Sequence, residues 1–323
     1  MKTQNAKTDS RLWWRDKRVM VTGGNGFLGR MLCARLNVAG VRHLSVVRRM
    51  EYNLLAEGAA AQAVSDYRPQ VVFHLAAVVG GIQFNTANPA SLLADNVRIG
   101  MNLLAPCQFH GVEKFINVGT TCSYPKHCPI PFREDDLWNG YPDETNAPYG
   151  IAKKCVAELV RVMHMEFGFP GVTAILANLY GPGDNFDLQT SHVMPGMIRR
   201  IATAKANDSP SVTLWGTGTA TRDFLHVCDA ADALIEIAEH VEPHEVVNIG
   251  TGVETRIDDL AGEIVGLCEY QGVVEFDSTR PDGQPRRCLS SEKRRNLIKW
   301  EPQISLHDGL SETITWWKQN SRE

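Results

Sequence analysis

A tyrosine and a lysine, Tyr149 and Lys153, are the residues of this chain whose types and spacing most clearly suggest chemistry. On a helix, residues four apart project from the same face, so the phenol and the ammonium would lie one turn from each other. A free phenol, with a pKa of about 10, is a poor proton donor or acceptor at neutral pH. A nearby ammonium favours the phenolate and lowers that pKa, so we expect the pair to exchange a proton with a substrate hydroxyl or carbonyl.

A glycine-rich turn near the N-terminus gives this pair a context. The segment Arg18–Thr22 predicts a short buried strand, and it runs into GGNGFLG, which starts at Gly23 and leads into apolar residues at helical spacing. The glycines permit a tight turn and let the backbone approach a pyrophosphate at the start of the helix. A flexible turn without a ligand is the alternative, and the Tyr149/Lys153 pair downstream favours the dinucleotide site.

Thr120 and Cys122 lie upstream of Tyr149, at the end of a strand that we expect to start at Lys114. Open parallel sheets bind ligands at the carboxyl ends of their strands, so the Thr120 hydroxyl could hydrogen-bond a substrate oxygen there. In extended backbone, residues two apart point the same way, which places Cys122 in the same cleft. A capping hydroxyl for Thr120 and a small buried apolar role for Cys122 stay open as alternatives.

Two arginines, Arg48 and Arg49, end the second expected strand. An acidic residue at this position would bind the ribose 2′-hydroxyl of NAD, and none is present. Arginine suits the 2′-phosphate of NADP instead. The alternative is a basic turn exposed to solvent.

The composition of the chain excludes several classes of protein. Its 323 residues are 43% hydrophobic and 22% charged with a formal net charge of -4, which indicates neither a nucleic acid nor a membrane partner. The cysteines form no Cys-x-x-Cys pair or spaced Cys/His set, so we expect no metal and a reducing, cytoplasmic compartment. No signal-peptide stretch opens the chain, and no apolar run approaches the roughly 18 residues of a membrane span.

Strand and helix patterns alternate from Val19 to about Asn178, which predicts an α/β fold with a Rossmann-type, doubly wound parallel sheet. After a turn-rich break at Tyr180–Asn185 the segments become shorter, which indicates a smaller C-terminal α/β lobe for the substrate. We therefore expect a cofactor domain over 15–178, with about 219–252 returning to its sheet, and a substrate lobe over 179–218 and 253–323.

Several short stretches carry a resemblance beyond these patterns: HLAAVVGGI from His74, TTCSYPK from Thr120, ETNAPYGIAKK from Glu144, NLYGPGDNF from Asn178, SHVMPGMIRR from Ser191, WGTGTATRDFLHV from Trp215, VNIGTG from Val247 and RPDGQPRR from Arg280. In this order they resemble the GDP-L-fucose synthase family of extended short-chain dehydrogenases/reductases. The cysteine after the Thr-Thr pair, together with Ser191-His192-Val193, is the most specific feature. The resemblance implies an enzyme that uses NADPH to convert GDP-4-keto-6-deoxy-D-mannose to GDP-L-fucose, by epimerisation at carbons 3 and 5 and reduction at carbon 4.

The same resemblance implies roles for particular residues. Thr120, Tyr149 and Lys153 take the reductase positions, while Cys122 and His192 take those of the pair that moves protons in epimerisation. Inversion of a carbon centre requires a base and an acid on opposite faces, and a thiolate and an imidazole titrate close enough to neutrality to serve. The residues implied at NADP(H) are Gly23, Gly26, Phe27, Leu28, Gly29, Arg48, Arg49, Ala76, Tyr149, Lys153, Asn178, Leu179 and His192. The residues implied at the GDP-sugar are Arg200, Trp215, Arg222, Arg280 and Asp282.

Some positions depart from the family pattern. Thr120-Thr121 replaces a serine pair, Asn53–Ala56 lacks the aspartate often placed against the adenine, and Ser290-Ser291 replaces a stretch that often carries Asp. An epimerase without net reduction, acting on a GDP-heptose or a sugar of GDP-mannose type, stays open, as does a ketoreductase without epimerisation. A non-catalytic NADP-binding sensor is the alternative from another class. The resemblance also implies a homodimer.

Overall fold

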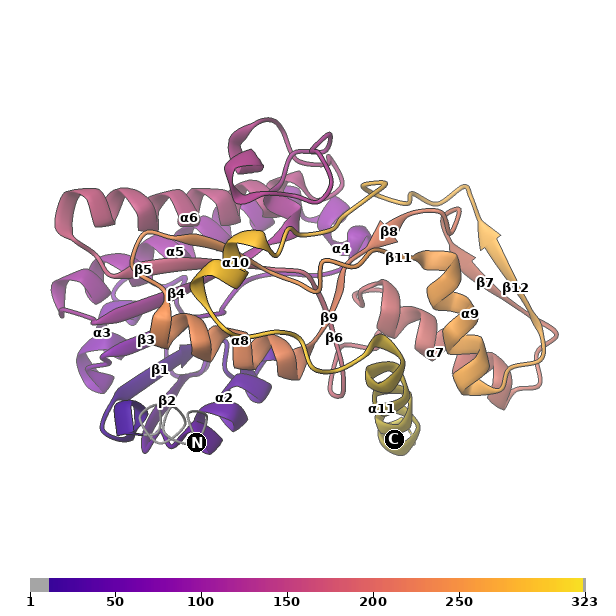
Figure 1. The fold of residues 1–323 in the computed structure, drawn as a ribbon, viewed down its shortest axis with the longest axis horizontal. Helices are drawn as coiled ribbons and strands as arrows, with labels where there is room; N and C mark the ends of the chain where they lie inside the picture. The colour runs from indigo at the N-terminus through magenta and orange to yellow at the C-terminus, as the bar shows by residue number, and fades with distance from the viewer. Residues whose placement is uncertain (1–11, 322–323) are drawn as a thin grey trace.

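The computed structural model describes residues 12–321, and a large parallel sheet dominates it (Figure 1). The sheet consists of β1 (Arg18–Thr22), β2 (His43–Val47), β3 (Val71–His74), β4 (Lys114–Thr120), β5 (Gly171–Leu176) and β10 (Val246–Ile249). Its six strands run in the order β10-β5-β4-β3-β1-β2, and every neighbouring pair is parallel. The predicted Rossmann-type sheet is confirmed. Because the order reverses at β1 and β3, a ligand crevice is expected at the carboxyl ends of these strands.

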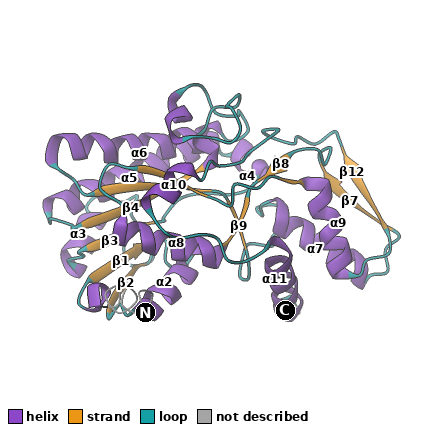
Figure 2. Ribbon diagram, viewed as in Figure 1, coloured by secondary structure: helices purple, strands orange, loops and turns teal. Residues whose placement is uncertain are grey.

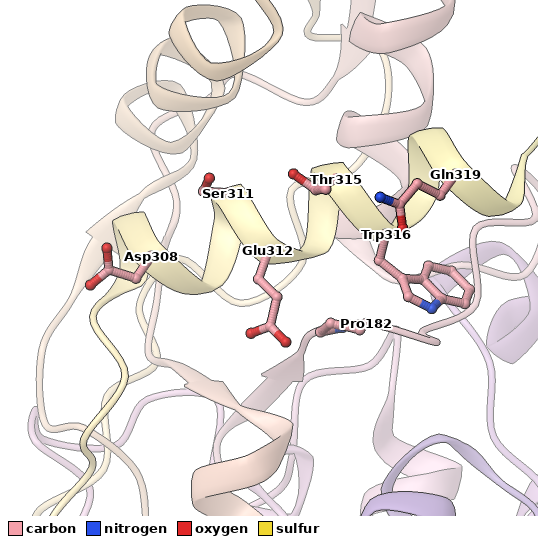
Figure 3. A pocket seen from close by; sticks show the side chains of 7 residues that line it. All are labelled: Pro182, Asp308, Ser311, Glu312, Thr315, Trp316 and Gln319. Carbon is pink, nitrogen blue, oxygen red and sulfur yellow. The ribbon is translucent and has the colours of Figure 1, made fainter.

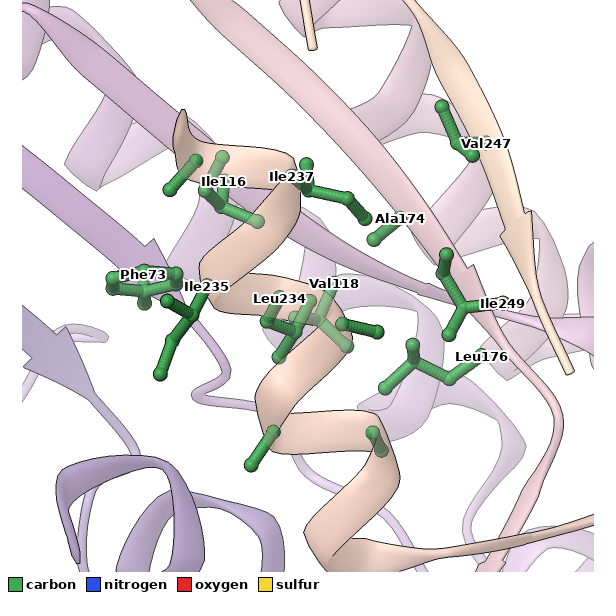
Figure 4. Close-up of a cluster of buried hydrophobic side chains, with 14 of the residues drawn as sticks. Phe73, Ile116, Val118, Ala174, Leu176, Leu234, Ile235, Ile237, Val247 and Ile249 are labelled. Carbon is green, nitrogen blue, oxygen red and sulfur yellow. The ribbon is translucent and has the colours of Figure 1, made fainter. Parts of the chain in front are cut away.

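Helices cover both faces of this sheet because its strands are apolar on both sides. They are α2 (Phe27–Ala39), α3 (Ala59–Tyr67), α4 (Ile82–Ala87), α5 (Pro89–Phe109), α6 (Ala147–Phe167) and α8 (Val227–His240). One core lies under α2 and α8, and a second lies under α3, α5 and α6 on the opposite face. Figure 4 shows Leu234, Ile235 and Ile237 of α8 beside the strand residues Phe73 and Ile116.

A smaller group of elements extends from one end of the sheet (Figures 1 and 2). The remaining elements are β6 (Asn178–Tyr180), α7 (Val193–Ala206), β7 (Ser211–Trp215), β8 (Thr221–Arg222), β9 (Phe224–His226), β11 (Thr255–Arg256), α9 (Ile257–Cys268), β12 (Val273–Asp277), α10 (Glu292–Leu297) and α11 (Leu306–Asn320). Ile198 of α7, Leu260 of α9 and Leu310 of α11 share a separate core, and the parallel pair β7–β12 packs on it through Leu214 and Phe276.

The segment expected to return to the large sheet does so only in part. β10 pairs with β5, whereas β8 pairs with β11 and β9 pairs with β6. The backbone explains the difference, because the chain after β5 continues past the edge of the sheet as β6. Asn178 there donates its N–H to Asp223 O at 3.0 Å, which keeps β9 beside β6 and away from the sheet.

The end of β4 lies against the start of α6 at backbone distance. The chain leaves β4 through a short 3-10 turn, Thr121–Ser123, and a Cβ built on Gly150 would stand 2.1 Å from Cys122 O. Ser123 Oγ donates to Gly150 O at 3.0 Å and closes the contact. Only glycine fits at this point, and the turn and the helix thereby carry their functional side chains to one place.

We expect a Gly150→Ala substitution to destabilise the protein by about 1–3 kcal/mol, the usual cost of overpacking, because the new methyl group must displace backbone. Gly262→Ala in α9 is the matched control, since a Cβ there meets nothing within 4 Å. That change should be neutral or stabilise by up to about 1 kcal/mol, because alanine favours helix. Urea unfolding midpoints measure both. A Gly150→Ala protein as stable as the Gly262→Ala protein would contradict the close contact.

Candidate active site

The glycine turn between β1 and α2 leaves room for a ligand at the start of the helix. Gly23 has φ +71°, and a Cβ there would lie 2.8 Å from Ala76 N, while one on Gly29 would lie 2.1 Å from Gly23 O. Gly26 precedes the helix without a side-chain cap, and the first turn, which begins with Phe27 and Leu28, holds no acidic residue. The unpaired N–H groups and the positive end of the helix dipole suit an anion such as a pyrophosphate.

Below this turn, polar side chains join the ends of β1 and β3. Thr22 Oγ1 accepts from Ala76 N at 3.2 Å and lies 2.9 Å from His74 Nδ1. Complete burial, with the charge of Lys153, lowers the pKa of His74 to about 3, so the imidazole is neutral. This neutral pair holds Ala76 and the glycine turn in register without adding charge beside the phosphate position.

The remaining residues implied at the cofactor surround this edge of the sheet. Arg48 and Arg49 are both exposed after β2, and Arg48 Nη1 lies 3.6 Å from Glu51 Oε1. Asn178 and Leu179 begin β6 directly beyond β5, and the Asn178 side chain donates to Asp223 O at 3.1 Å. The exposed guanidinium groups are therefore available to an anionic group, since a surface ion pair of this kind holds them only weakly.

Tyr149 and Lys153 lie on one face of α6, and both are buried. Lys153 Nζ donates to Val118 O at 2.7 Å, and burial lowers its pKa to about 8. The expectation that the ammonium lowers the pKa of Tyr149 is wrong for this structure. Burial, helped by Cys122, raises the pKa of Tyr149 well above its ordinary value. The effect of desolvation on the pKa of Tyr149 therefore outweighs that of the lysine charge, and Tyr149 is a phenol rather than a phenolate.

Thr120 and Cys122 reach this pair from the end of β4. Thr120 Oγ1 accepts from Cys122 N at 3.2 Å, so the hydroxyl does act as a cap, the alternative weighed for it above. Cys122 is half-buried, which disagrees with a purely apolar packing role. A Cβ on Gly150, the residue after Tyr149, would lie 2.1 Å from Cys122 O, so the cysteine and the tyrosine stand at the same junction of β4 and α6.

His192 approaches from the other group of elements, at the position before α7. Its side chain caps no backbone N–H of the helix. The preceding residues contact the loop after β3, where Gly81 N donates to Thr190 O at 3.0 Å. The His192 residue is exposed, but protein atoms crowd around the imidazole. The resulting desolvation, together with the charge of Arg287, lowers the pKa of His192. Arg287 Nη1 in turn donates to Cys122 Sγ at 3.3 Å, so one guanidinium links the two groups.

Three of the residues implied at the GDP-sugar form a cluster. The guanidinium carbons of Arg200 and Arg280 lie 5.4 Å and 5.1 Å from the ring centre of Trp215. Trp215 is 42% exposed, which is incompatible with the core-packing alternative for it. Two guanidinium groups on one aromatic platform form a cationic surface suited to bind a diphosphate.

Arg222 and Asp282 engage other parts of the protein in this structure. Arg222 donates from Nη1 to Thr221 O and Gln284 O, both at 2.7 Å, and from Nη2 to Asp282 O at 3.0 Å. Burial lowers its pKa to about 9. Asp282 accepts from the Thr217 N–H and hydroxyl, each at 2.8 Å. The two residues thus fix the Trp215 loop beside the Arg280 segment.

The sequence profile of the NAD dependent epimerase/dehydratase family matches residues 19–250. The chain belongs to this family. GDP-L-fucose synthase of Escherichia coli is 36% identical, over 94% of this chain and 97% of that protein. GDP-L-fucose synthase 1 of Arabidopsis thaliana is 35% identical, over 94% of each chain.

Two solved structures that resemble this chain are named as enzymes of GDP-sugars. A GDP-L-fucose synthetase from Naegleria fowleri bound to NADP superposes with a TM-score of 0.85 at 27% identity, over 95% of each chain. A GDP-6-OMe-4-keto-L-xylo-heptose reductase from C. jejuni gives 0.89 at 25% identity, over 94% of this chain and 98% of that one. The likeness extends over both groups of elements.

Two hollows, of about 450 and 490 Å³, are lined by other residues than the Tyr149 and Cys122 groups. Figure 3 shows the first, where Glu312 and Trp316 of α11 point toward Pro182 and Asp308 lies at the start of the helix, and its acidic lining does not suit phosphate. Across residues 12–321, His, Cys, Asp and Glu side chains nowhere gather in a group of three or more that could hold a metal ion. Over the same range, no helix is long and apolar enough to cross a membrane.

Arg287 is the residue of this site that the sequence did not reveal. It stands in the RPDGQPRR stretch beside Arg286, and nothing in the sequence distinguishes the two. In the structure Arg286 is exposed and pairs with Glu254, whereas Arg287 is buried against Cys122. Only the fold distinguishes Arg287 from Arg286, because the partner of Arg287, Cys122, is 165 positions away in the sequence.

The buried ammonium of Lys153 leads to a prediction about stability and pH. Its pKa is about 8 in the folded protein, against about 10.4 when unfolded, so between these values the unfolded chain binds the proton and the folded protein does not. The free energy of unfolding should therefore rise with pH in this window, by up to about 1.4 kcal/mol per pH unit, and Lys153→Met should lack this rise. Denaturant unfolding of both proteins at several pH values measures the difference. Parallel pH curves for the two would contradict a lowered pKa.

Proposed function

We propose that this protein is an NADPH-dependent epimerase-reductase that converts GDP-4-keto-6-deoxy-D-mannose to GDP-L-fucose. The observation that carries the proposal is that a tyrosine-lysine pair on α6 and a cysteine just beyond β4 stand at one backbone junction, in the domain whose glycine turn suits a dinucleotide. The near full-length similarity to GDP-L-fucose synthases supports it. A non-catalytic sensor has no need of these groups.

The epimerase half of the reaction rests on Cys122 and His192. A carbonyl at carbon 4 acidifies the hydrogens on carbons 3 and 5, because the anion left behind is delocalised as an enolate. The Cys122 thiolate removes a proton from one face, and His192 returns one to the other. The lowered pKa of His192 makes its protonated form a stronger acid, and it also makes that form the minor one at neutral pH.

The reductase half rests on Tyr149. NADPH, held by the glycine turn and by Arg48 and Arg49, supplies the hydride that reduces carbon 4. Because burial raises its pKa, Tyr149 carries a proton at neutral pH and donates it to the oxygen on carbon 4. Lys153 holds the end of β4 through Val118 O and stabilises the phenolate that results. Thr120 Oγ1 orients the same substrate oxygen.

The rest of the GDP-sugar extends along the second group of elements. Arg200 and Arg280 bind the diphosphate, and Trp215 lies against the base or the ribose. Arg222 and Asp282 complete this part of the site by holding its loops. We retain the cofactor domain over 15–178 and 219–252 as part of the proposal, because β10 joins the large sheet.

For the assembly we propose a homodimer through α5 and α6. These helices expose Met101 and Phe109 on α5 and Met165 on α6. The two helices pack against each other, and exposed apolar side chains on neighbouring elements support an interface. The cytoplasm is the proposed compartment, because all eight cysteines are free thiols.

A GDP-heptose is the second candidate substrate, favoured by the similarity to the C. jejuni heptose reductase. Parallel assays with GDP-4-keto-6-deoxy-D-mannose and a GDP-4-keto-heptose separate the two. The sugar with the higher kcat/KM is the substrate.

In the first test, the protein is incubated with GDP-4-keto-6-deoxy-D-mannose and NADPH, and NADPH absorbance and product stereochemistry are followed. The wild type should form GDP-L-fucose, and Tyr149→Phe should lower the reduction rate at least about a hundredfold, because the proton donor is lost. Tyr141→Phe makes the same change at an exposed tyrosine and should have no effect. NADPH oxidation by Tyr149→Phe at the wild-type rate would remove Tyr149 from the mechanism.

A second test isolates epimerisation in heavy water, without NADPH. The wild type should incorporate deuterium at carbons 3 and 5 of the sugar, and Cys122→Ser should lose most of it, because a hydroxyl is too weak an acid to supply a base. Cys155→Ser, at an exposed cysteine of α6, is the control and should exchange normally. Unchanged exchange in Cys122→Ser would make the cysteine a packing residue and leave a plain ketoreductase.

A further inference from the structure

Arg287 is a buried guanidinium without a carboxylate partner. Its residue is 5% exposed, and within residues 12–321 no acidic side chain forms an ion pair with it. Its side-chain hydrogen bonds go from Nε to Gln284 Oε1 at 2.9 Å and from Nη1 to Cys122 Sγ at 3.3 Å. A buried charge is costly unless it is paired, so the sulfur is the group placed to balance this one.

The guanidinium is held in place by a second residue. Gln284, which is buried, donates from Nε2 to Pro125 O and Lys126 O, both at 3.0 Å, and its Oε1 accepts from Arg287. The two carbonyls belong to the same chain segment that carries Cys122. Gln284 and Arg287 thus link the segment after β4 to the sulfur of Cys122. This chain of hydrogen bonds fixes the direction of Arg287 Nη1.

The other charged and titratable groups around Cys122 do not replace this contact. Arg222 interacts electrostatically with the sulfur, but backbone carbonyls take its Nη1 and Nη2. Tyr149 is a neutral phenol. No described carboxylate hydrogen-bonds the sulfur. The hydrogen bond from Arg287 Nη1 is therefore the contact placed to stabilise a negative charge on Cys122 Sγ.

We propose that Arg287 is a positioning residue that keeps Cys122 as a thiolate, the base of the epimerisation, an inference that rests on the proposed function. A guanidinium N–H donating to a thiolate is a charge-assisted hydrogen bond. The thiolate takes a proton from the carbon beside the carbonyl, the electron pair of that C–H bond enters the enolate, and an S–H bond forms. His192 then protonates the opposite face. The thiol afterwards loses its proton to solvent, and His192 regains one.

The test measures the thiolate without any sugar. Iodoacetamide alkylates thiolates, and peptide mass spectrometry follows Cys122 with the exposed Cys155 as an internal reference. At neutral pH, Arg287→Met should slow alkylation of Cys122 about ten- to a hundredfold, and Arg287→Lys should recover most of the rate. Arg286→Met removes the same charge from an exposed neighbour and should react as the wild type does. Near pH 10, where thiols ionise without help, all four proteins should react alike, which shows that the site stays intact.

Equal rates for Arg287→Met and wild type at neutral pH would overturn the proposal, and so would equal slowing by Arg286→Met. The deuterium exchange assay gives the second readout, since Arg287→Met should lower exchange at carbons 3 and 5 by a similar factor. A wild type that exchanges nothing would refute the proposed function, while the alkylation rates would still decide whether Arg287 sustains the thiolate.

Discussion

The backbone contact between the end of β4 and the start of α6 is the constraint on which the candidate site depends. At Gly150 the backbone of α6 and the backbone after β4 approach so closely that no side chain fits between them. Lys153, one turn further along α6, reaches Val118 O on β4 and strengthens the same junction. A proton donor on a helix and a thiol beyond a strand therefore share one cleft. The parallel sheet supplies the frame, because its strands all end at this edge.

Burial determines the protonation states in this cleft more than the neighbouring charges do. It lowers the pKa of Lys153 and Arg222, and it raises that of Tyr149. The chain has a net charge of -4, yet the arginines gather where an anionic substrate is expected. Attraction for a nucleotide-sugar is thus local, produced by a few guanidinium groups.

Local patterns in the sequence were sufficient to predict the parallel sheet and the glycine turn. The strand Arg18–Thr22 matches residue for residue, because apolar, β-branched residues directly before a turn are typical of buried parallel strands. Two kinds of information were missing. The pairing of β8 and β9 depends on where β6 leads, and the protonation of Tyr149 depends on burial that no spacing reveals. Arg287 escaped notice because its partner lies far away in the chain.

The hydrogen bonds of Gln284 to Pro125 O and Lys126 O have a mechanical consequence. They fasten the segment that leads to Arg287 onto the loop after β4. Hydrogen bonds therefore join the large-sheet group and the smaller group of elements close to Cys122. Cys122, Gln284 and Arg287 are therefore linked in one hydrogen-bonded unit that spans both groups of elements.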